Sequence, residues 1–596
     1  MSVRTSDEGT AARDLNPESI ADRTTVGVFF RQAARYGDRV LVHYPDGEAW
    51  KTVTWAEMRR NILAVASALV EAGVEPRDHV AIFAPNCIEW LYCDFGIQAA
   101  GAIAVPIYSG TVPEVAQTIV ANCDAVMAIV SDSKMAAKLK TNDILRHIVT
   151  MDVEVSRWLS DSLQREGEVV ARMEAIRPDD VCTIVYTSGT TGDPKGAELA
   201  HRSLVDATRA VMKVHPLTDA DFTLSWLPFS HVFERINGTF SVLVFGGQMW
   251  LSHGVERLAE DLAEVQPTVL LSVPRVYEKM HARVMDRVRE SRRDRRALFT
   301  WAIGVGTHFS HEPHPGPVLR AKHRVAEGLV LGPLRRRLVG GGLRFFISGG
   351  AALAREIEEF FWAIGVPILN GWGMTETSSG VCSNTLTEHR FLTVGKPFPG
   401  VELKLEKDGE ILVNGPGNML GYHKDPVATA AMLDHGWIRT GDIGEIDADG
   451  FLRITDRKKD LIKTAGGKYV APQQLEFEIQ RDDLVEQAVV IGESRPYVTA
   501  LIVPDWAAVR KKVPGRPEEL IEDKRVIELI QDGVDALNKR VGSWEAIKYF
   551  TLLPRAFSEE AGEITPTLKI KRKVIAQRYA EQIDSMYAGK RKPGVG

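Results

Sequence analysis

One stretch of this sequence restricts the possible folds and functions more than any other. The apolar residues Val181–Tyr186 predict a short buried strand, because several are β-branched and turn-forming residues follow them. The next ten residues, 187–196, contain three glycines, four hydroxyl side chains and Lys195. Glycines let successive backbone N–H groups point into one concavity that binds anions, and the other side chains add donors and a cation. The loop therefore suits a polyphosphate, and the alternative is a flexible surface turn.

The surroundings of this loop differ from those of the common P-loop. The pattern GxxxxGK[ST] does not occur in the chain, and no long helix is expected directly after the loop. Helices are predicted for residues 25–35, 53–72 and 87–100, and strands for residues 79–83 and 102–107. This alternation predicts an α/β fold in which helices cover mainly parallel sheets.

Length and composition narrow the class of protein further. The chain has 596 residues, which is too long for one hydrophobic core and predicts two or more domains. A net charge of −6 and the lack of a basic stripe argue against a nucleic-acid partner. The five cysteines form no CxxC pair, as expected for reduced cysteines of a cytoplasmic protein. No apolar run reaches the roughly 18 residues that span a membrane, and residues 1–20 lack the apolar core of a signal peptide.

The glycine-rich loop resembles the phosphate loop of the adenylate-forming superfamily. That superfamily contains acyl-CoA synthetases, luciferases and the adenylation domains of peptide synthetases, and the pattern [ST]-[SG]-G-[ST]-[ST]-G-x-P-K-G is specific to it. The resemblance implies that Thr190 takes part in catalysis and contacts a metal ion. It implies that ATP is bound by Thr187, Ser188, Gly189, Thr190, Thr191, Gly192 and Lys195.

Later stretches match further motifs of the same superfamily, in the same order along the chain. Residues 368–377 resemble the motif Y-G-x-T-E, with tryptophan in place of the usual tyrosine. Here Trp372 would flank the adenine, Thr375 would lie near the α-phosphate and Glu376 would hold Mg²⁺ as a catalytic residue. Asp442 resembles the aspartate that binds the ribose hydroxyls. The nucleotide would also contact Gly350, Ala351, Gly371 and Gly373.

The acyl side of the site is expected from three residues. His231, in a Pro-x-x-His context, resembles a histidine near the acyl carboxylate, and the alternative is a core histidine. Gly349 would also contact the acyl substrate. Tyr277 lies where long-chain members carry a gate aromatic, often tryptophan, and a packed core tyrosine is the alternative.

Residues 456–476 resemble the hinge and the coenzyme A channel of the superfamily. Arg457 would contact the nucleotide and Lys459 would be the pivot. Gly466 and Gly467 would let the backbone approach the pantetheine arm of coenzyme A. Lys569, in a lysine-rich stretch near the chain end, matches the catalytic lysine, and a solvated basic tail is the alternative.

These matches predict an Mg²⁺- and ATP-dependent long-chain fatty acid–CoA ligase. We expect a loose leader over residues 1–24 and an adenylation domain of helix-covered parallel sheets with a barrel-like subdomain over 25–455. A hinge at 456–460 and an α+β cap domain over 461–596 would follow. A fatty acyl-AMP ligase that delivers to a carrier protein and an inactive fatty-acid-binding relative are the alternatives. Acyl chain length and oligomeric state stay open.

A basic region between the motifs suggests a second property. Residues 281–342 contain thirteen Lys and Arg against five Asp and Glu, interleaved with apolar patches such as 297–305 and 329–334. Basic amphipathic segments bind anionic membrane surfaces, so we expect peripheral membrane contact. The alternative is a solvated helical face.

Overall fold

The structure is a computed structural model of the chain, and it describes residues 16–160, 164–187, 194–458, 461–558, 561–564 and 570–588. The chain divides into two compact units. The first unit comprises Met1–Lys404, Leu412–Thr440 and Asp447–Leu452, and the second comprises Leu405–Ile411, Gly441–Ile446 and Arg453–Gly596. The hinge predicted at residues 456–460 falls within the second unit, and its residues 459–460 lie outside the described residues.

The first sheet contains the strand that precedes the glycine-rich loop. Its strand order is β18 (Gly421–Tyr422), β8 (Lys195–Ala200), β7 (Val181–Thr187), β4 (Ile103–Ile107), β3 (His79–Phe83), β5 (Met127–Val130) and β6 (His147–Thr150). The pairs from β7 to β6 are parallel, whereas β8 runs antiparallel to β7 and to β18. Side chains alternate between its two faces: Val80 and Ile82 of β3 join one core cluster, and Ala81 and Phe83 join another.

The second sheet is also mainly parallel. Its order is β15 (Lys396–Pro397), β14 (Ser379–Ser383), β13 (Ile368–Met374), β12 (Phe345–Ser348), β11 (Val269–Ser272), β9 (Phe222–Ser225), β10 (Gln248–Leu251), β1 (Val40–Asp46) and β2 (Ala49–Thr54). The central strands from β13 to β1 are parallel. The edge strands β2, β14 and β15 are antiparallel to their neighbours.

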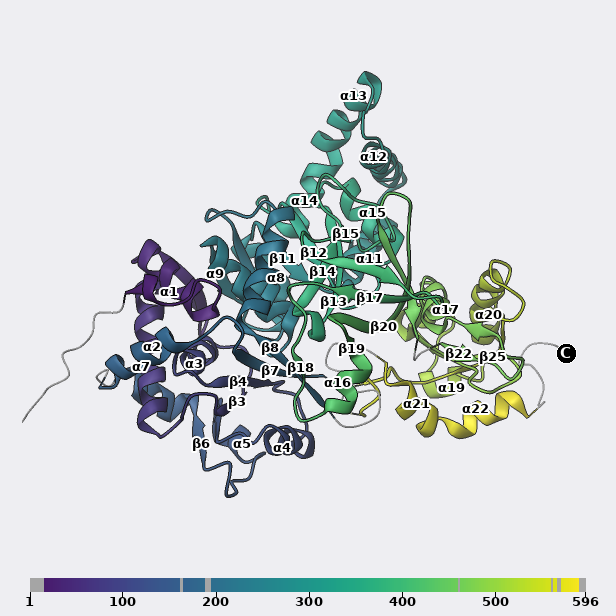
Figure 1. Cartoon of the computed structure of the whole chain (residues 1–596). Helices are drawn as coiled ribbons and strands as arrows, with labels where there is room; N and C mark the ends of the chain where they lie inside the picture. Colours follow the sequence, from purple (N-terminus) through teal and green to yellow (C-terminus); the bar gives the residue numbers. More distant parts are fainter. Residues whose placement is uncertain are drawn as a thin grey trace, which may run out of the picture. The chain divides into compact units, whose positions relative to one another are not determined.

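Helices cover both sheets of the first unit (Figure 1). They are α1 (Thr25–Tyr36), α2 (Trp55–Glu71), α3 (Ile88–Ala99), α4 (Pro113–Asn122), α5 (Ser133–Ala136), α6 (Ser156–Ser160), α7 (Glu166–Ala175), α8 (His201–Val214), α9 (Ser241–Phe245), α10 (Leu258–Val265), α11 (Pro274–Glu290), α12 (Arg293–His311), α13 (Pro317–Ala326), α14 (Gly332–Val339), α15 (Arg355–Ala363) and α16 (Pro426–Met432). Short 3₁₀ or π turns are η1 (Pro17–Ser19), η2 (Met151–Val155), η3 (Phe233–Phe240), η4 (Val255–Arg257), η5 (Glu327–Leu331) and η6 (Thr375–Thr377).

Local chemistry explains where α2 begins. The sequence pattern predicted a helix from residue 53, but Thr54 ends β2 and caps the helix, which starts at Trp55. The Thr54 hydroxyl accepts a hydrogen bond from the backbone N–H of Glu57, and the Glu57 carboxylate accepts one from the backbone N–H of Thr54. This reciprocal capping satisfies backbone donors that a helix start leaves unpaired.

The predicted leader is partly described, from residue 16 onward. Ile20 is buried, and its carbonyl oxygen accepts a hydrogen bond from the Arg31 guanidinium. The Ser19 hydroxyl donates to the carboxylate of Glu174 on α7. Residues 16–24 therefore pack on the first unit, and residues 1–15 lie outside the described residues.

A third, curled sheet follows the two large ones along the chain. Its order is β16 (Glu402–Leu405), β17 (Glu410–Asn414), β20 (Trp437–Ile446) and β19 (Leu433–Asp434), and β21 (Leu452–Arg457) also pairs with β20. β16 and β17 fall in the stretch 403–413, where apolar and polar residues alternate as is typical of strands.

The rest of the second unit is a small α+β fold. A hairpin of β22 (Ile462–Lys463) and β23 (Tyr469–Val470) precedes a sheet of β24 (Val485–Ile491), β25 (Val498–Pro504) and β26 (Ile547–Leu552). Its helices are α17 (Pro472–Ile479), α18 (Trp506–Lys512), α19 (Pro517–Leu520), α20 (Lys524–Asn538), α21 (Arg572–Arg578) and α22 (Ala580–Tyr587). One face of the sheet packs with α17 and α20, and the other packs with α21 and α22.

These elements confirm the predicted fold class: α/β, with mainly parallel helix-covered sheets, a small curled sheet and a C-terminal α+β part. Within the described ranges, no helix combines the length and the apolar character needed to cross a membrane.

Candidate functional site

The glycine-rich loop connects two antiparallel strands of the first sheet. Thr187 ends β7 and faces Lys195, the first residue of β8. Between them, Ser188, Gly189, Thr190, Thr191 and Gly192 lie outside the described residues. The loop is thus followed by a strand, so no long helix comes directly after it, in agreement with the sequence analysis.

The predicted metal residue lies at the end of the second sheet. Glu376 is in η6, directly after β13, and only 6% of its surface is exposed. The Tyr422 hydroxyl donates a hydrogen bond of 2.6 Å to Oε1 of Glu376. The backbone N–H of Met419 donates to the Glu376 carbonyl oxygen over 2.8 Å. Among the described residues, the other carboxylate oxygen, Oε2, has no hydrogen-bond partner.

Tyr422 also contacts the lysine of the glycine-rich loop. Nζ of Lys195 lies 5.4 Å from the centroid of the Tyr422 ring. Burial, and then the negative charge of Glu376, raise the pKa of Tyr422, so its hydroxyl remains a hydrogen-bond donor. The fold therefore brings Lys195 and Glu376, 181 positions apart by their numbers, to one shared neighbour. Sequence reasoning had missed Tyr422, because no local pattern distinguishes it.

β13 and β14 form a tight hairpin, and Glu376 lies in the turn that connects them. A Cβ on Gly373 would lie 1.8 Å from the carbonyl oxygen of Ser379, so only glycine fits there. Gly371 and Trp372 lie on the same strand, and Thr375 begins η6. The predicted nucleotide residues 371–376 thus lie consecutively at the end of β13 and the start of η6.

The predicted residues 349–351 follow the neighbouring strand, β12. β12 and β13 are parallel, with Ser348 opposite Asn370, so both motifs leave the same edge of the sheet. Ligands in open α/β sheets bind at this edge, where parallel strands end. A Cβ on Gly349 would lie 3.2 Å from the ring of Phe233, and Gly350 has φ +87°. Ala351 is exposed.

His231 lies just before η3. Its Nδ1 accepts a hydrogen bond of 3.3 Å from the backbone N–H of Phe233, the residue whose ring approaches Gly349. His231 and Gly349, both predicted on the acyl side, are therefore linked through Phe233. π-type turns such as η3 occur frequently at functional sites.

A buried carboxyl group in η3 was missed by sequence reasoning. Glu234 is 2% exposed, and its Oε1 accepts a hydrogen bond of 2.5 Å from the Ser225 hydroxyl. Burial raises the pKa of Glu234 to about 8. Glutamate is usually an exposed residue, so nothing local in the sequence indicated this burial.

Tyr277 lies in α11 and is 0% exposed. Its ring makes edge-to-face contacts with Phe346 and Phe361, at centroid distances of 5.0 and 5.7 Å. Its hydroxyl lies 3.4 Å from the carbonyl oxygen of Ile347. The structure thus places Tyr277 among core aromatic residues on one face of the second sheet.

Two predicted nucleotide residues form an ion pair in the second unit. Asp442 on β20 is 4% exposed, and its Oδ1 lies 2.9 Å from Nε of Arg457 on β21. The next residue, Lys458, makes ion pairs with Asp408 and Glu410 at 2.6 and 2.7 Å. These ion pairs join the end of β21 to β20 and to β17, directly before the predicted pivot, Lys459. Lys459 itself lies outside the described residues.

The two glycines predicted for the coenzyme A channel lie at the tip of the β22–β23 hairpin. Gly467 has φ +74°, and its N–H donates to the carbonyl oxygen of Thr464 over 2.8 Å. A Cβ on Gly467 would meet no atom within 4 Å, so backbone strain rather than crowding favours glycine there. The predicted catalytic lysine, Lys569, lies outside the described residues.

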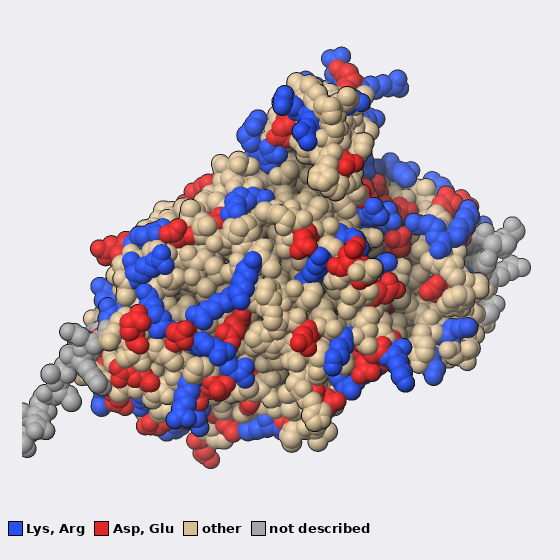
Figure 2. Space-filling view, turned by 45° about the horizontal axis from the view of Figure 1, so that its top comes forward, with Lys and Arg blue, Asp and Glu red and all other residues tan. Residues whose placement is uncertain are grey.

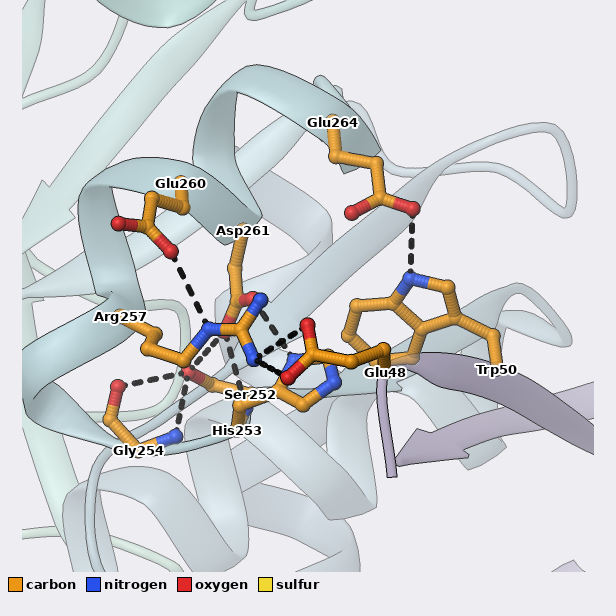
Figure 3. A network of polar contacts seen from close by, with 9 residues as sticks. All are labelled: Glu48, Trp50, Ser252, His253, Gly254, Arg257, Glu260, Asp261 and Glu264. Carbon is orange, nitrogen blue, oxygen red and sulfur yellow. Dashed lines mark hydrogen bonds and ion pairs between the residues drawn. The ribbon is translucent and has the colours of Figure 1, made fainter. Parts of the chain in front are cut away.

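A polar network in the first unit lies apart from the predicted residues (Figure 3). Asp261 accepts hydrogen bonds from the Ser252 hydroxyl at 2.6 Å and from the His253 backbone N–H at 2.9 Å. Its Oδ1 is 2.8 Å from Nδ1 of His253. The serine donates to the aspartate instead of the histidine, so this is not the nucleophile–base arrangement of a hydrolase. The network anchors the turn after β10.

Comparison with known proteins matches both parts of the chain to described families. Residues 29–423 match the family described as AMP-binding enzyme, and residues 459–591 match the AMP-binding enzyme C-terminal domain. The long-chain-fatty-acid–CoA ligase FadD15 of Mycobacterium bovis is 37% identical over 562 residues, covering 90% of this chain and 92% of the relative. The human long-chain-fatty-acid–CoA ligase 1 is 32% identical, covering 88% of this chain and 80% of the relative.

Solved structures support the same fold. The crystal structure of the anthranilate CoA ligase AuaEII in complex with anthranoyl-AMP superposes with a TM-score of 0.70 at 21% identity. The alignment covers 97% of this chain and 100% of that one. At this identity the likeness concerns the fold alone.

Proposed function

We propose that this chain, which belongs to the AMP-binding enzyme family, is an ATP-dependent long-chain fatty acid–CoA ligase. The observation that carries the proposal is that Lys195, from the first sheet, and Glu376, from the end of a strand of the second, both contact Tyr422. Relatives named as long-chain ligases, similar over most of their length, support the choice of substrate.

The reaction has two steps. A fatty acid carboxylate attacks the α-phosphorus of ATP, the bond to the β-phosphate breaks, and acyl-AMP and pyrophosphate form. The thiol of coenzyme A then loses its proton and attacks the acyl carbon, and AMP leaves. Both partners of the first step are anions, so the protein must supply cations and fixed donors. Lys195, Lys569 and the loop 187–192 would do so, with Thr190 beside the metal, and His231 would orient the carboxylate.

The donor set fits a bound Mg²⁺ ion. Oε2 of Glu376 has no hydrogen-bond partner among the described residues, whereas Oε1 is held by Tyr422. No group of three or more His, Cys, Asp or Glu side chains in the described ranges could hold a metal. Mg²⁺ commonly uses one or two carboxylates together with substrate phosphates and water, so Glu376 suffices. When bound, Mg²⁺ would neutralise phosphate charge and orient the phosphates.

The second unit would contribute to both steps. Asp442 would accept hydrogen bonds from the ribose hydroxyls, and Arg457 would contact the nucleotide beside it. The backbone at Gly466 and Gly467 would line the pantetheine path. Because Lys569 and Gly467 belong to one unit yet serve different steps, a pivot at Lys459 would exchange them.

Separate assays of the two steps test this division of roles. Lys569→Ala should lose acyl-AMP formation by about 3 kcal/mol, the scale of one preorganised donor, yet still convert supplied acyl-AMP to thioester. Lys459→Pro should form acyl-AMP but transfer it slowly, because proline fixes φ at the pivot. Equal loss of both steps in both folded variants would contradict the assigned roles.

The function as a whole is tested by pyrophosphate release with acids from acetate to long-chain fatty acids. We expect release that depends on ATP and on a long acyl chain, followed by acyl-CoA formation with free coenzyme A. Acyl-AMP that accumulates despite free coenzyme A would favour a ligase that delivers to a carrier protein. No pyrophosphate release with any acid would favour an inactive fatty-acid-binding relative.

We also propose that the basic region contacts anionic membranes peripherally. α12 packs against α13 and α15, and the α12–α13 pair projects outward from the first unit (Figure 1). Figure 2 shows Lys and Arg side chains gathered on this projection. Val318, Val325 and Leu329 are 67%, 51% and 60% exposed, at helical spacing along α13 and η5. Arg320 and Arg324 lie exposed among them.

Vesicle sedimentation tests the membrane proposal. Reversing Arg320 and Arg324 to Glu should weaken binding to anionic vesicles, since each basic residue near such a surface contributes about 1 kcal/mol. Reversing the exposed Arg60 and Lys213, on α2 and α8, is the matched control. Equal binding of wild type to neutral and anionic vesicles, or to neither, would leave a solvated face as the explanation.

A further inference from the structure

The segment that carries Tyr422 joins the two sheets of the first unit. β18 pairs antiparallel with β8, with Tyr422 opposite Ala197. The backbone N–H of His423 donates to the Gly196 carbonyl oxygen over 2.7 Å. Through these contacts Tyr422 is attached to the strand that begins with Lys195, immediately after the glycine-rich loop.

The same segment holds Glu376 at two points. The Met419 N–H binds the backbone carbonyl of Glu376, and the Tyr422 hydroxyl binds its carboxylate. Tyr422 is 8% exposed and Glu376 is 6% exposed, so water competes little for this hydrogen bond. A hydrogen bond to a charged group contributes more than one between neutral groups.

A glutamate carboxylate otherwise has broad rotational freedom about its last side-chain bond. The Tyr422 hydroxyl removes that freedom by binding Oε1, and it leaves Oε2 for another ligand. Because the donor is neutral, it orients the carboxylate without adding a compensating positive charge. The ring of the same residue lies below Nζ of Lys195, so one side chain is next to both charged groups.

We propose that Tyr422 is a positioning residue that orients Glu376 toward the metal ion on ATP, on the side where Lys195 lies. This inference rests on the proposed function, in which Glu376 holds Mg²⁺. It assigns to Tyr422 a role in metal-dependent nucleotide binding, separate from any direct contact with substrate.

The decisive variant is Tyr422→Phe, which removes the hydroxyl and keeps the ring beside Lys195. Calorimetric titration should show about tenfold weaker binding of ATP in the presence of Mg²⁺, as expected for losing a hydrogen bond to a charged group. Binding of AMP in EDTA should change less than about twofold, since no metal is involved. The Mg²⁺ concentration needed for half-maximal ATP binding should rise.

Tyr186→Phe is the matched control. Tyr186 lies on β7, and its hydroxyl donates to Oδ1 of Asn122 at 2.5 Å and not to Glu376. The same chemical change there should leave the Mg²⁺ requirement unaltered. If Tyr186→Phe shifted it as much as Tyr422→Phe, a general effect on the sheet would replace our explanation.

A double-mutant cycle keeps the inference testable if Tyr422→Phe is also less stable. In a Glu376→Gln background, Tyr422→Phe should have little further effect on ATP binding, because its partner charge is gone. Additive effects would overturn the inference, and so would an unchanged Mg²⁺ requirement in Tyr422→Phe. Wild-type protein that bound no ATP with Mg²⁺ would instead contradict the proposed function itself.

Discussion

Two buried glutamates, one in each unit, are held in opposite ways. Glu234 is 2% exposed and Glu563 is 0% exposed. Glu234 meets the neutral hydroxyl of Ser225, and burial raises its pKa to about 8. Burial alone would also raise the pKa of Glu563, but hydrogen bonds from Arg555 and Arg578 outweigh it and lower the pKa to about 2. The charge of a buried carboxyl group therefore depends on its hydrogen-bond partners as much as on its burial.

The same contrast recurs at the candidate site. Glu376 in the first unit is oriented by the neutral Tyr422 hydroxyl, whereas Asp442 in the second is paired with the Arg457 guanidinium. A neutral hydrogen-bond donor leaves the charge of a carboxylate available to a metal cation, whereas a paired guanidinium already balances that charge. The first arrangement suits a metal ligand and the second suits a group that accepts hydrogen bonds from a sugar.

The largest predicted effect is on catalytic activity, where Glu376 and Asp442 should differ. Glu376→Gln should lower the rate of pyrophosphate release about 100-fold or more, because it removes charge that acts on the phosphates. Asp442→Asn should cost about tenfold, mainly as a higher KM for ATP, since it weakens hydrogen bonds to the ribose. Steady-state kinetics at saturating Mg²⁺ would measure both. Equal losses would mean that the two carboxylates do not differ in role.

The next effect concerns the stability of the second unit. Glu563→Gln should lower the free energy of unfolding by about 2 kcal/mol at pH 7, because it removes the buried negative charge that pairs with Arg555 and Arg578. The loss should not be larger, because both arginines are partly exposed to water. The pKa of Glu563 is lowered from its ordinary 4.5 to about 2, so its contribution is complete above about pH 4.5 and is lost as the pH falls toward 2.

Thermal unfolding at several pH values measures this loss. The gap between wild type and Glu563→Gln should narrow below pH 4.5, the ordinary pKa. The exposed Glu581→Gln on α22 is the control and should change little. A gap that stayed constant down to pH 3 would show that the arginines stabilise through packing instead of charge.

Glu234 should show the opposite pH dependence. Its folded pKa of about 8 exceeds the ordinary 4.5, so the folded protein keeps a proton that the unfolded chain loses between these values. The free energy of unfolding should therefore fall as the pH rises through that window, by at most about 1.4 kcal/mol per pH unit. Relative to wild type, Glu234→Gln should gain stability between pH 5 and 8. A constant difference across this range would mean that Glu234 is ionised in the fold.

The smallest predicted effect is on stability, at Tyr277, whose neutral hydroxyl lies near a neutral carbonyl group. Tyr277→Phe should lower stability by less than about 1 kcal/mol, because the hydroxyl lies 3.4 Å from the Ile347 carbonyl oxygen. As a gate, Tyr277 would also set the preference for acyl chain length. An unchanged substrate profile in folded Tyr277→Phe and Tyr277→Trp variants would remove the gate hypothesis.

The sequence by itself determined the elements whose signal is local. β3 has the predicted bounds, His79–Phe83, because an apolar run between polar turns is enough to define a strand. The positions of Lys195 and Glu376 after strands were also predictable, because turn-forming glycines follow apolar runs at both places. Local patterns extend over a few residues, and these features need no more.

Only the tertiary structure decided which distant residues meet. Tyr422 reaches Glu376 across 46 positions, and Arg578 reaches Glu563 from a helix that follows it. Glu234 and Glu563 are the same residue type with no local distinction, yet burial and partners shift their pKa values in opposite directions. The physical reason is that desolvation and charge pairing depend on what the fold packs around a side chain, and no short stretch of sequence contains that information.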